Sequence, residues 1–277
     1  MKSGTELLTH ILYLSIYSLG NLNLHQTLRI ATFNIHKGVT HLNARFALHH
    51  QRDLLRKLHA DIVFLQEVRD EHTPHRERFS AWPQFGQAEY LAEAVWPDYT
   101  YGKNSVYPTG HHGNALLSKF PIITSSNVDI SAHSLEQRGM LHSQINVPGW
   151  DQPLHTICLH LGLFAQWRRQ QLLAVTEFIQ TKVPADAPLI IAGDFNDWGM
   201  RTGRLFAEHL NMHEVFERHT GKPARSFPSW LPMLRLDRIY ARGFHVKQAE
   251  VHSGAQFIKV SDHAMLSATL TRTHKLP

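Results

Sequence analysis

The chain of 277 residues contains a single cysteine, Cys158. An internal disulfide is therefore excluded, which rules out the small disulfide-stapled folds and is compatible with a reducing compartment. Cys158 lies within an apolar stretch of strand length, so we interpret it as a small buried hydrophobic residue rather than a reactive thiol.

Apolar runs long enough to cross a membrane are also missing. The best candidate, residues 7–19, is interrupted by His10, has a single nearby Lys2, and lacks a small-x-small cleavage pattern. A transmembrane helix needs about 20 apolar residues. We therefore expect residues 1–25 to form a helix that packs on the domain or rests on a partner or membrane surface, rather than a span or a signal peptide. The expected location is cytoplasmic, with membrane association through this segment as the alternative.

Internal repeats and low-complexity tracts are absent. With 43% hydrophobic residues, 16 glycines and 13 prolines, the composition is typical of a globular protein rather than a disordered or fibrous one. The length permits one domain or two. We expect a single domain over residues 26–277, because the candidate site described below draws on both halves of the chain.

The 23 aspartate and glutamate residues are fewer than the 28 lysine and arginine residues, which gives a formal charge of +5. The positive field favours an anionic partner such as a phosphate-bearing ligand. Basic residues do not cluster with interleaved aromatic residues, so the charge alone does not identify nucleic acid as that partner. The 22 histidines are scattered, and most are expected to have surface or packing roles.

Polar and ionisable residues stand at the margins of apolar stretches of strand length. Rigid backbone at strand ends can aim such side chains at a common rim of a sheet. These residues are Asn34 after 28–33, Glu67 after 61–66, His160 after 154–159, Asp194 and Asn196 after 188–192, Asp237 within 236–240, and Asp262 and His263 before 264–270.

These residue types suit the hydrolysis of a phosphate ester. Because a phosphodiester is an anion that repels a nucleophile, attack by water needs a cation on a phosphoryl oxygen, a base for the water, and an acid or cation for the leaving group. Hard oxygen ligands such as Glu67 select Mg²⁺ or Mn²⁺. Each residue alone has a plainer interpretation, as a turn residue or a surface acid at a strand end.

The chain resembles the endonuclease/exonuclease/phosphatase superfamily, the DNase I-like metal-dependent hydrolases. The resemblance covers most of the chain and implies an α+β fold: a four-layered α/β sandwich in which two mixed β-sheets pack face to face and are flanked by helices. It rests on the order and spacing of residues 33–38 (FNIHKG), 65–68 (LQEV), 113–122 (GNALLSKFPI), 137–139 (QRG), 159–161 (LHL), 193–196 (GDFN), 236–239 (LDRI) and 261–263 (SDH).

The resemblance implies a metal site and a water-activating group. Glu67 matches the metal-binding position, and Asn34 and Asp262 are expected to complete the inner or water-mediated shell. Asp194 matches the residue that orients or deprotonates the attacking water. Asn196 matches the amide that holds the phosphate and that water.

The resemblance also implies groups that contact the phosphate. His263 matches the histidine at the scissile phosphate, with Asp237 accepting a hydrogen bond from its other ring nitrogen. His160 is the second candidate acid. Arg138 is a candidate substrate-binding residue, with an exposed ion pair as the alternative. His36 faces a metal-bound water or shapes the loop with Lys37 and Gly38.

The leading hypothesis is a Mg²⁺- or Mn²⁺-dependent phosphodiesterase or nuclease that acts by in-line attack of water. The alternatives are a phosphomonoesterase, a phospholipid or phosphoinositide headgroup hydrolase, and a phosphate- or lipid-binding module without activity. The expected partner is thus nucleic acid or a phospholipid headgroup, and no obligate protein partner is indicated. Residues 82–112 and 227–232, which flank the motifs, are expected to select the substrate.

Secondary structure is predicted from periodicity and breakers. We expect Asn43 to cap a helix that runs to about Ala60, with Ala47, Leu54 and Leu58 on one face. Residues 71–113 are predicted as a helix with long loops. Strands are expected at 114–118, 122–130 and 139–147, the last two as antiparallel neighbours, and a helix at 165–181.

Overall fold

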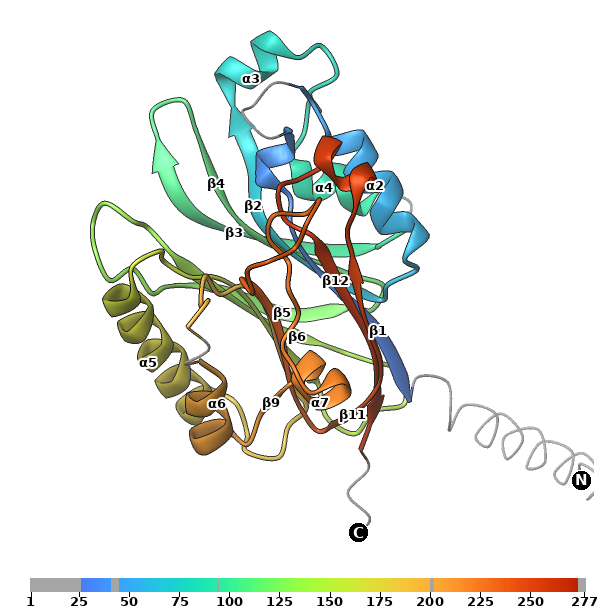
Figure 1. Cartoon of the computed structure of the whole chain (residues 1–277), viewed down its shortest axis with the longest axis vertical. Helices are drawn as coiled ribbons and strands as arrows, with labels where there is room; N and C mark the ends of the chain where they lie inside the picture. The colour runs from blue at the N-terminus through green and yellow to red at the C-terminus, as the bar shows by residue number, and fades with distance from the viewer. Residues whose placement is uncertain (1–25, 41–44, 94, 200–201, 274–277) are drawn as a thin grey trace, which may run out of the picture.

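Two mixed sheets organise the computed structural model, which describes residues 26–40, 45–93, 95–199 and 202–273 (Figure 1). The first sheet has six strands in the order β11-β12-β1-β2-β4-β3. Its strands are β1 (Thr27–Asn34), β2 (Ile62–His72), β3 (Asp98–Tyr107), β4 (Gly110–Ser118), β11 (Phe244–His252) and β12 (Met265–Arg272).

The second sheet also has six strands, in the order β5-β6-β7-β8-β10-β9. Its strands are β5 (Ile122–Asp129), β6 (Gly139–Ile145), β7 (Leu154–His160), β8 (Leu189–Asp194), β9 (His213–Glu214) and β10 (Asp237–Arg242). In each sheet one central pair is parallel, β1 with β2 and β7 with β8, while the other pairs are antiparallel.

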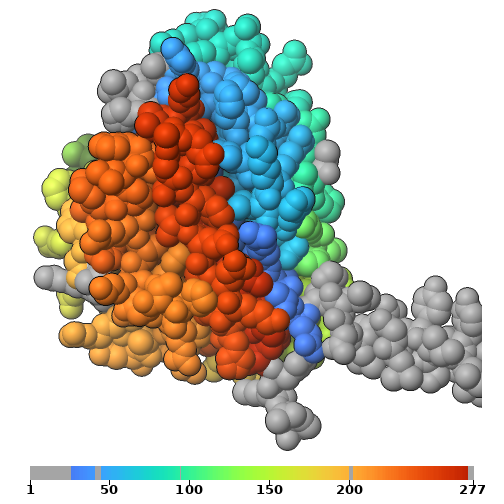
Figure 2. All heavy atoms as spheres, turned by 45° about the vertical axis from the view of Figure 1, so that its right-hand side comes forward, coloured from blue at the N-terminus to red at the C-terminus, as the bar shows by residue number. Residues whose placement is uncertain are grey.

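Strand register brings the predicted site residues to one end of both sheets. His160 pairs with Asp194 where β7 and β8 end, and Asp237 pairs with Asp194 where the antiparallel β10 begins. In the first sheet, β12 starts beside the end of β1, so residues just before Met265 return to Asn34. Figure 2 shows the red C-terminal strand running beside the blue N-terminal one. The topology therefore gathers groups that are more than 200 residues apart in the sequence.

The main core lies between the sheets. Because side chains alternate across a strand, every second residue of the central strands enters this layer. Its members include Ile30, Phe64, Leu141 and Ile190. Cys158 belongs to the same core, fully buried, and burial raises the pKa of its thiol to about 12. The interpretation of Cys158 as a buried hydrophobic residue is confirmed.

Helices cover the outer faces of the sheets and complete the four layers. On the first sheet lie α2 (Leu48–Lys57) and α4 (Gln87–Ala92), and on the second α5 (Ala165–Lys182) and α6 (Thr202–Leu210) (Figure 1). The other helical segments are η1 (His36–Gly38), α3 (Thr73–Arg78), α7 (Val215–Thr220) and η3 (Ala255–Lys259). The predicted fold class is confirmed.

Two predictions of local structure need correction. The first helix begins at Leu48 rather than near Asn43, which lies outside the described residues, and it buries Leu55 while Leu54 is only half-buried. Residues 71–113 contain a strand pair, β3 and the start of β4, as well as α3 and α4. The prediction of loops failed because β3 is an edge strand with only Gly102 buried, so its sequence lacks the alternation that marks a half-buried strand.

Residues 1–25, for which an apolar helix was predicted, lie outside the described part of the chain. Among the described residues, no helix is long and apolar enough to cross a membrane. The helix predicted at 165–181 is α5, and its inward residues Leu172, Val175 and Ile179 are buried as expected.

Candidate active site

A pocket of about 380 Å³ opens at the end of the sheets where the predicted residues gather. It has a polar half and an apolar half. The polar half consists of Lys37, Glu67, His112, Arg138, His160, Asp194, Asn196 and His263, and the apolar half of Leu163, Trp198, Phe227, Leu234 and Leu236.

Glu67 reaches the pocket because β2 is irregular at that point. The pairing of β2 with β4 shifts register between Leu65 and Val68, and Glu67 adopts a positive φ of 56°. Such a backbone is costly for a residue other than glycine, so it is typical of functional positions. Asn34 donates from Nδ2 toward Glu67 Oε1 at 3.4 Å and toward Asp194 Oδ2 at 3.2 Å, and thereby links the two sheets.

The Glu67 carboxylate is buried yet held in its charged form. Burial alone would raise its pKa, but the positive charge of Lys37 and smaller contributions from nearby histidines lower the pKa well below its ordinary value. Oε2 of Glu67 accepts no hydrogen bond and faces Lys37 Nζ at 3.4 Å. An ionised carboxylate with one oxygen that accepts no hydrogen bond is a suitable ligand for a hard divalent cation.

Asp194 stands at the centre of the polar half. Its Oδ1 accepts a hydrogen bond from the Asn196 backbone N–H at 3.0 Å, and its Oδ2 lies 3.6 Å from His160 Nε2 and 3.7 Å from His263 Nε2. Burial raises the pKa of Asp194 to about 6, the Asp237 charge adds to this effect, and His263 opposes it. Asn196 is fixed in turn by its Nδ2, which donates to Leu161 O at 2.9 Å.

Position 193 must be a glycine because strand β7 passes very close to the backbone of β8 there. Its φ is +151°, and a Cβ atom added there would lie 1.9 Å from the Leu159 carbonyl oxygen. Only glycine therefore allows β8 to present Asp194 beside β7.

His263 and Asp237 form a buried pair, with Nδ1 and Oδ2 2.9 Å apart. Burial alone would lower the pKa of His263, but the Asp237 and Asp194 charges raise it to about 10. Oxygen and nitrogen atoms of Asp194, Asp237 and His263 all lie within 4.8 Å of one another, a spacing that would suit a metal ion. A protonated imidazole has no lone pair to offer to a metal ion, however, whereas the Glu67 carboxylate has.

His160 differs from His263 in its charge. It is buried, and burial followed by the nearby Arg138 charge lowers its pKa well below the ordinary value. A neutral imidazole is a poor general acid, so His263 is the better proton donor of the two.

Arg138 lines the pocket while Nη2 contacts Glu136 Oε1 at 3.2 Å. The side chains are only 14% and 12% exposed, so the ion pair is largely buried rather than exposed as the alternative assumed. Nε of Arg138 has no hydrogen-bond partner. The guanidinium group thus combines a fixed position with an unused donor beside the pocket.

The three predicted metal ligands are not equivalent. Glu67 lines the pocket, Asn34 bridges Glu67 and Asp194, and Asp262 lies behind, where its Oδ1 is 3.1 Å from His36 Nδ1. Burial raises the pKa of Asp262, but the hydrogen bond from His36 and the charge of His263 bring it below its ordinary value. This contact of His36 with Asp262 is neither of the two roles considered for His36, which were to face a metal-bound water or to shape the loop.

Sequence reasoning gave no individual role to two polar residues of the lining, Lys37 and His112. Lys37, considered only as part of a loop, adopts a positive φ of 62° and so turns back to Glu67. His112 enters from β4, and burial lowers its pKa to about 4. Lys37 could have been proposed as a site residue because it lies in the motif at 33–38. Nothing in the sequence around His112 distinguishes it from the other histidines.

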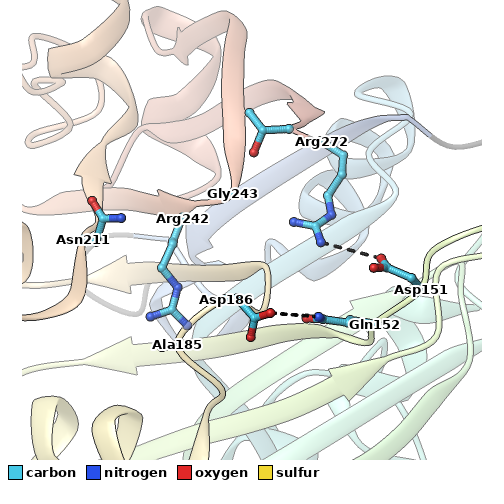
Figure 3. Close-up of a pocket in the computed structure, with 9 residues that line it drawn as sticks. Asp151, Gln152, Ala185, Asp186, Asn211, Arg242, Gly243 and Arg272 are labelled. Atoms are coloured by element: carbon cyan, nitrogen blue, oxygen red, sulfur yellow. Dashed lines mark hydrogen bonds and ion pairs between the residues drawn. The ribbon is translucent and has the colours of Figure 1, made fainter. Parts of the chain in front are cut away.

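A second polar pocket, of about 370 Å³, lies at the opposite end of β10, where Arg242 ends the strand that Asp237 begins (Figure 3). The Arg242 guanidinium group donates to three backbone carbonyls, those of Pro184, Ala187 and Leu210. Figure 3 shows Arg272 directed toward Asp151, with the charged atoms 3.9 Å apart. Because these cations are already engaged within the protein, the pocket has the features of a structural cavity rather than an anion site.

Comparison with known proteins shows to which family the chain belongs. The sequence profile of the endonuclease/exonuclease/phosphatase family matches residues 31–263, which include all the residues discussed for the active site. The chain belongs to this family. The family is generally hydrolytic on phosphoester bonds.

Individual relatives support the same placement. The uncharacterized protein YbhP of Escherichia coli strain K12 is 41% identical over 242 residues, which cover 87% of this chain and 95% of that protein. The structure of humanized D. rerio TDP2 has a TM-score of 0.64 at 21% identity, covering 89% of this chain and 99% of the other. A mannosyl-6-phosphatase of Bacteroides thetaiotaomicron has a TM-score of 0.65 at 16% identity, covering 88% and 99%. The two structures are similar to this chain in fold.

Proposed function

We propose that the protein is a Mg²⁺- or Mn²⁺-dependent phosphodiesterase. The observation that carries the proposal is the convergence of Glu67, Asp194 and His263 on one pocket, where neighbouring charges lower the pKa of Glu67 and raise that of His263. Membership of a hydrolytic family supports phosphoester cleavage in general. Cleavage of a diester in particular, with the help of a bound Mg²⁺ or Mn²⁺ ion, goes beyond what family membership supports and is proposed here.

Charge balance in the pocket favours a diester over a monoester. Each cation of the polar half already faces a carboxylate: Lys37 faces Glu67, Arg138 faces Glu136, and His263 faces Asp237. The protein therefore brings little surplus positive charge of its own. A phosphodiester carries one negative charge, whereas a monoester at neutral pH approaches two and needs more compensation.

The proposed reaction is in-line displacement at phosphorus. Asp194 orients a water molecule and accepts its proton as the water oxygen bonds to phosphorus; the bond from phosphorus to the leaving oxygen breaks, and that oxygen takes up the proton that His263 gives up from Nε2. Asn196 positions the phosphate and the water, and before the proton transfer His263 donates one hydrogen bond to the ester through Nε2, because its Nδ1 is engaged by Asp237. Glu67 would hold the metal ion, with Asn34 and Asp262 behind it, and a bound divalent ion supplies charge stabilisation to the phosphoryl oxygens.

The test is hydrolysis of an aryl phosphodiester by the full chain, with Mg²⁺ or Mn²⁺ and then with excess EDTA. We expect metal-dependent turnover that Asp194→Asn lowers by about 10² to 10⁴, the range of general-base effects. Asp151→Asn, an exposed acid at the far end of the molecule, is the matched control and keeps the wild-type rate. Full activity in EDTA rules out the metal role. The corresponding aryl phosphomonoester is assayed in parallel, and its faster turnover would show that the protein is a phosphomonoesterase. Ligand binding without product over every metal supports a binding module instead.

A further inference from the structure

The apolar half of the pocket is not explained by phosphate chemistry. Leu163, Trp198 and Leu234 line it while remaining 54%, 52% and 43% exposed. Phe227 completes the wall beside the site, with its ring 5.1 Å from the His263 ring. The apolar wall therefore lies directly beside the histidine that is proposed to face the phosphate.

The wall continues into the loop 227–234. The loop closes on itself, because the backbone N–H groups of Met233 and Leu234 both donate to Phe227 O at 2.8 Å. It is also tied to the site segment, because Ser229 N donates to Asp262 O at 2.7 Å and Ser229 Oγ donates to Ser261 O at 2.7 Å. The catalytic segment and this loop are thus held in a fixed relation.

The held loop presents large apolar side chains to solvent. Trp230, Leu231 and Met233 are 56%, 52% and 57% exposed. Across the pocket, Phe164 next to Leu163 is 61% exposed. Several exposed apolar groups near the mouth of a site are typical of a surface that receives an apolar partner.

Charge around the loop indicates which partner. Arg225 and Arg235 flank the loop closely in the sequence, Arg218 and Lys222 lie further upstream, and the nearest acidic residues in the sequence are Glu217 and Asp237. Basic residues that flank an exposed apolar loop complement an anionic lipid surface, where the apolar groups enter the headgroup region and the cations contact phosphates.

Nucleic acid fits the same surface less well. Base stacking uses aromatic platforms along a cationic track. Leu163, Leu231, Met233 and Leu234 provide aliphatic contact without a π-face, and the Arg168 guanidinium already lies 5.0 Å from the Trp198 ring centre.

We propose that the loop 227–234 and the apolar wall (Leu163, Trp198, Phe227 and Leu234) receive the acyl and glyceride part of a phospholipid, so that the ester cleaved is borne by a lipid at an anionic surface. This inference rests on the proposed function for its chemistry, whereas contact with the lipid surface does not depend on turnover.

The test compares the full-length wild type with Leu231→Asp/Met233→Asp, which changes two exposed side chains. Ile123→Asp is the control: Ile123 is 53% exposed and lies on β5 next to Ile122, which pairs with Ile145 at the end of the sheet remote from His160. All three proteins keep residues 1–25, so a difference between them reports the loop. Circular dichroism melting checks that each is folded.

Binding is measured by co-sedimentation with vesicles of phosphatidylglycerol and phosphatidylcholine in equal parts. Turnover is measured on dihexanoyl phosphatidylglycerol below and above its critical micelle concentration, on an aryl phosphodiester, and on a single-stranded oligonucleotide. We expect the loop variant to bind vesicles at least tenfold more weakly and to lower the ratio of lipid to aryl turnover at least tenfold. Ile123→Asp should match the wild type in both.

Wild-type binding and an unchanged ratio in the loop variant overturn the inference. Oligonucleotide turnover that exceeds lipid turnover, with no vesicle binding, overturns it in favour of nucleic acid. If the wild type cleaves no ester but binds vesicles through the loop, the proposed function fails while the lipid contact stands.

Discussion

Asn34 on β1 and Asp194 on β8 are joined across the two sheets by a hydrogen bond of 3.2 Å. The same amide group reaches Glu67 Oε1 at 3.4 Å, so one buried side chain relates the candidate metal ligand to the candidate base. A carboxylate at position 34 would repel both neighbours, whereas an amide can donate to both. The neutral amide group of Asn34 therefore fixes the position of Glu67 relative to Asp194.

Glu67→Gln tests the cation site without relying on turnover. Glutamine keeps the shape but loses the charge, so we expect Mg²⁺ or Mn²⁺ to bind at least tenfold more weakly. Melting temperature is measured against metal concentration, because a ligand that binds only the folded state raises it. Glu77→Gln, an exposed acid on α3, is the control and should respond to metal as the wild type does. An unchanged response in Glu67→Gln would place the ion elsewhere.

Asp237→Asn tests the assignment of a proton to His263. Loss of the Asp237 charge removes the largest influence that raises the pKa of this ring, so the pKa should fall from about 10. We expect turnover to drop about 10²-fold or more, and the alkaline limb of the pH profile to move to lower pH. NMR titration of the imidazole measures the pKa directly. A ring that stays protonated to the same pH in the variant would contradict the assignment.

Much of this arrangement is predictable from the sequence because strand ends carry their own signals. Short apolar runs followed by Asn34, Glu67, His160 and Asp194 mark both the strands and the common rim. The position of Glu67 depends on a register shift in β2 that no residue pattern reveals.

Edge strands and residues drawn in by tertiary packing are harder to predict. Strand β3 has only Gly102 fully buried, and its polar composition resembles that of a loop. His112 enters the pocket through strand register and not through a motif. Both features follow from how the sheets assemble, which a local pattern does not encode.

Gly193→Ala tests the close approach of β7 and β8. The new methyl group would lie 1.9 Å from Leu159 O, a backbone atom in the middle of a sheet that cannot move away alone. We expect a loss of about 3 kcal/mol or more in the free energy of unfolding, in the range of overpacking combined with backbone strain. The matched control is Gly203→Ala in α6, where the nearest atom to the new methyl group is Tyr240 Oη at 3.7 Å. That change should stabilise by up to about 1 kcal/mol through helix propensity. Urea unfolding of both variants measures the difference, and equal stabilities would contradict the steric requirement.

The buried pair His142 and His155 makes stability depend on pH in a predictable direction. The two rings share a hydrogen bond of 3.0 Å, which requires that at least one nitrogen keep its lone pair. Burial, followed by the neighbouring His155, lowers the pKa of His142 to about 4 from an ordinary value near 6.5. Between these values the unfolded chain binds a proton that the folded chain excludes, so stability falls as the pH drops from about 6.5 to about 4.

The expected size of this effect at pH 5, relative to pH 7.5, is about 2 kcal/mol for His142. His142→Gln keeps a polar group but removes the titration, so its unfolding free energy should lose about that much less on acidification. His219→Gln, at an exposed position, is the control and should change with pH as the wild type does. Urea unfolding at pH 5 and pH 7.5 measures the three proteins. Parallel pH dependence in His142→Gln and the wild type would show that the pair holds a proton in the folded state as readily as in the unfolded chain.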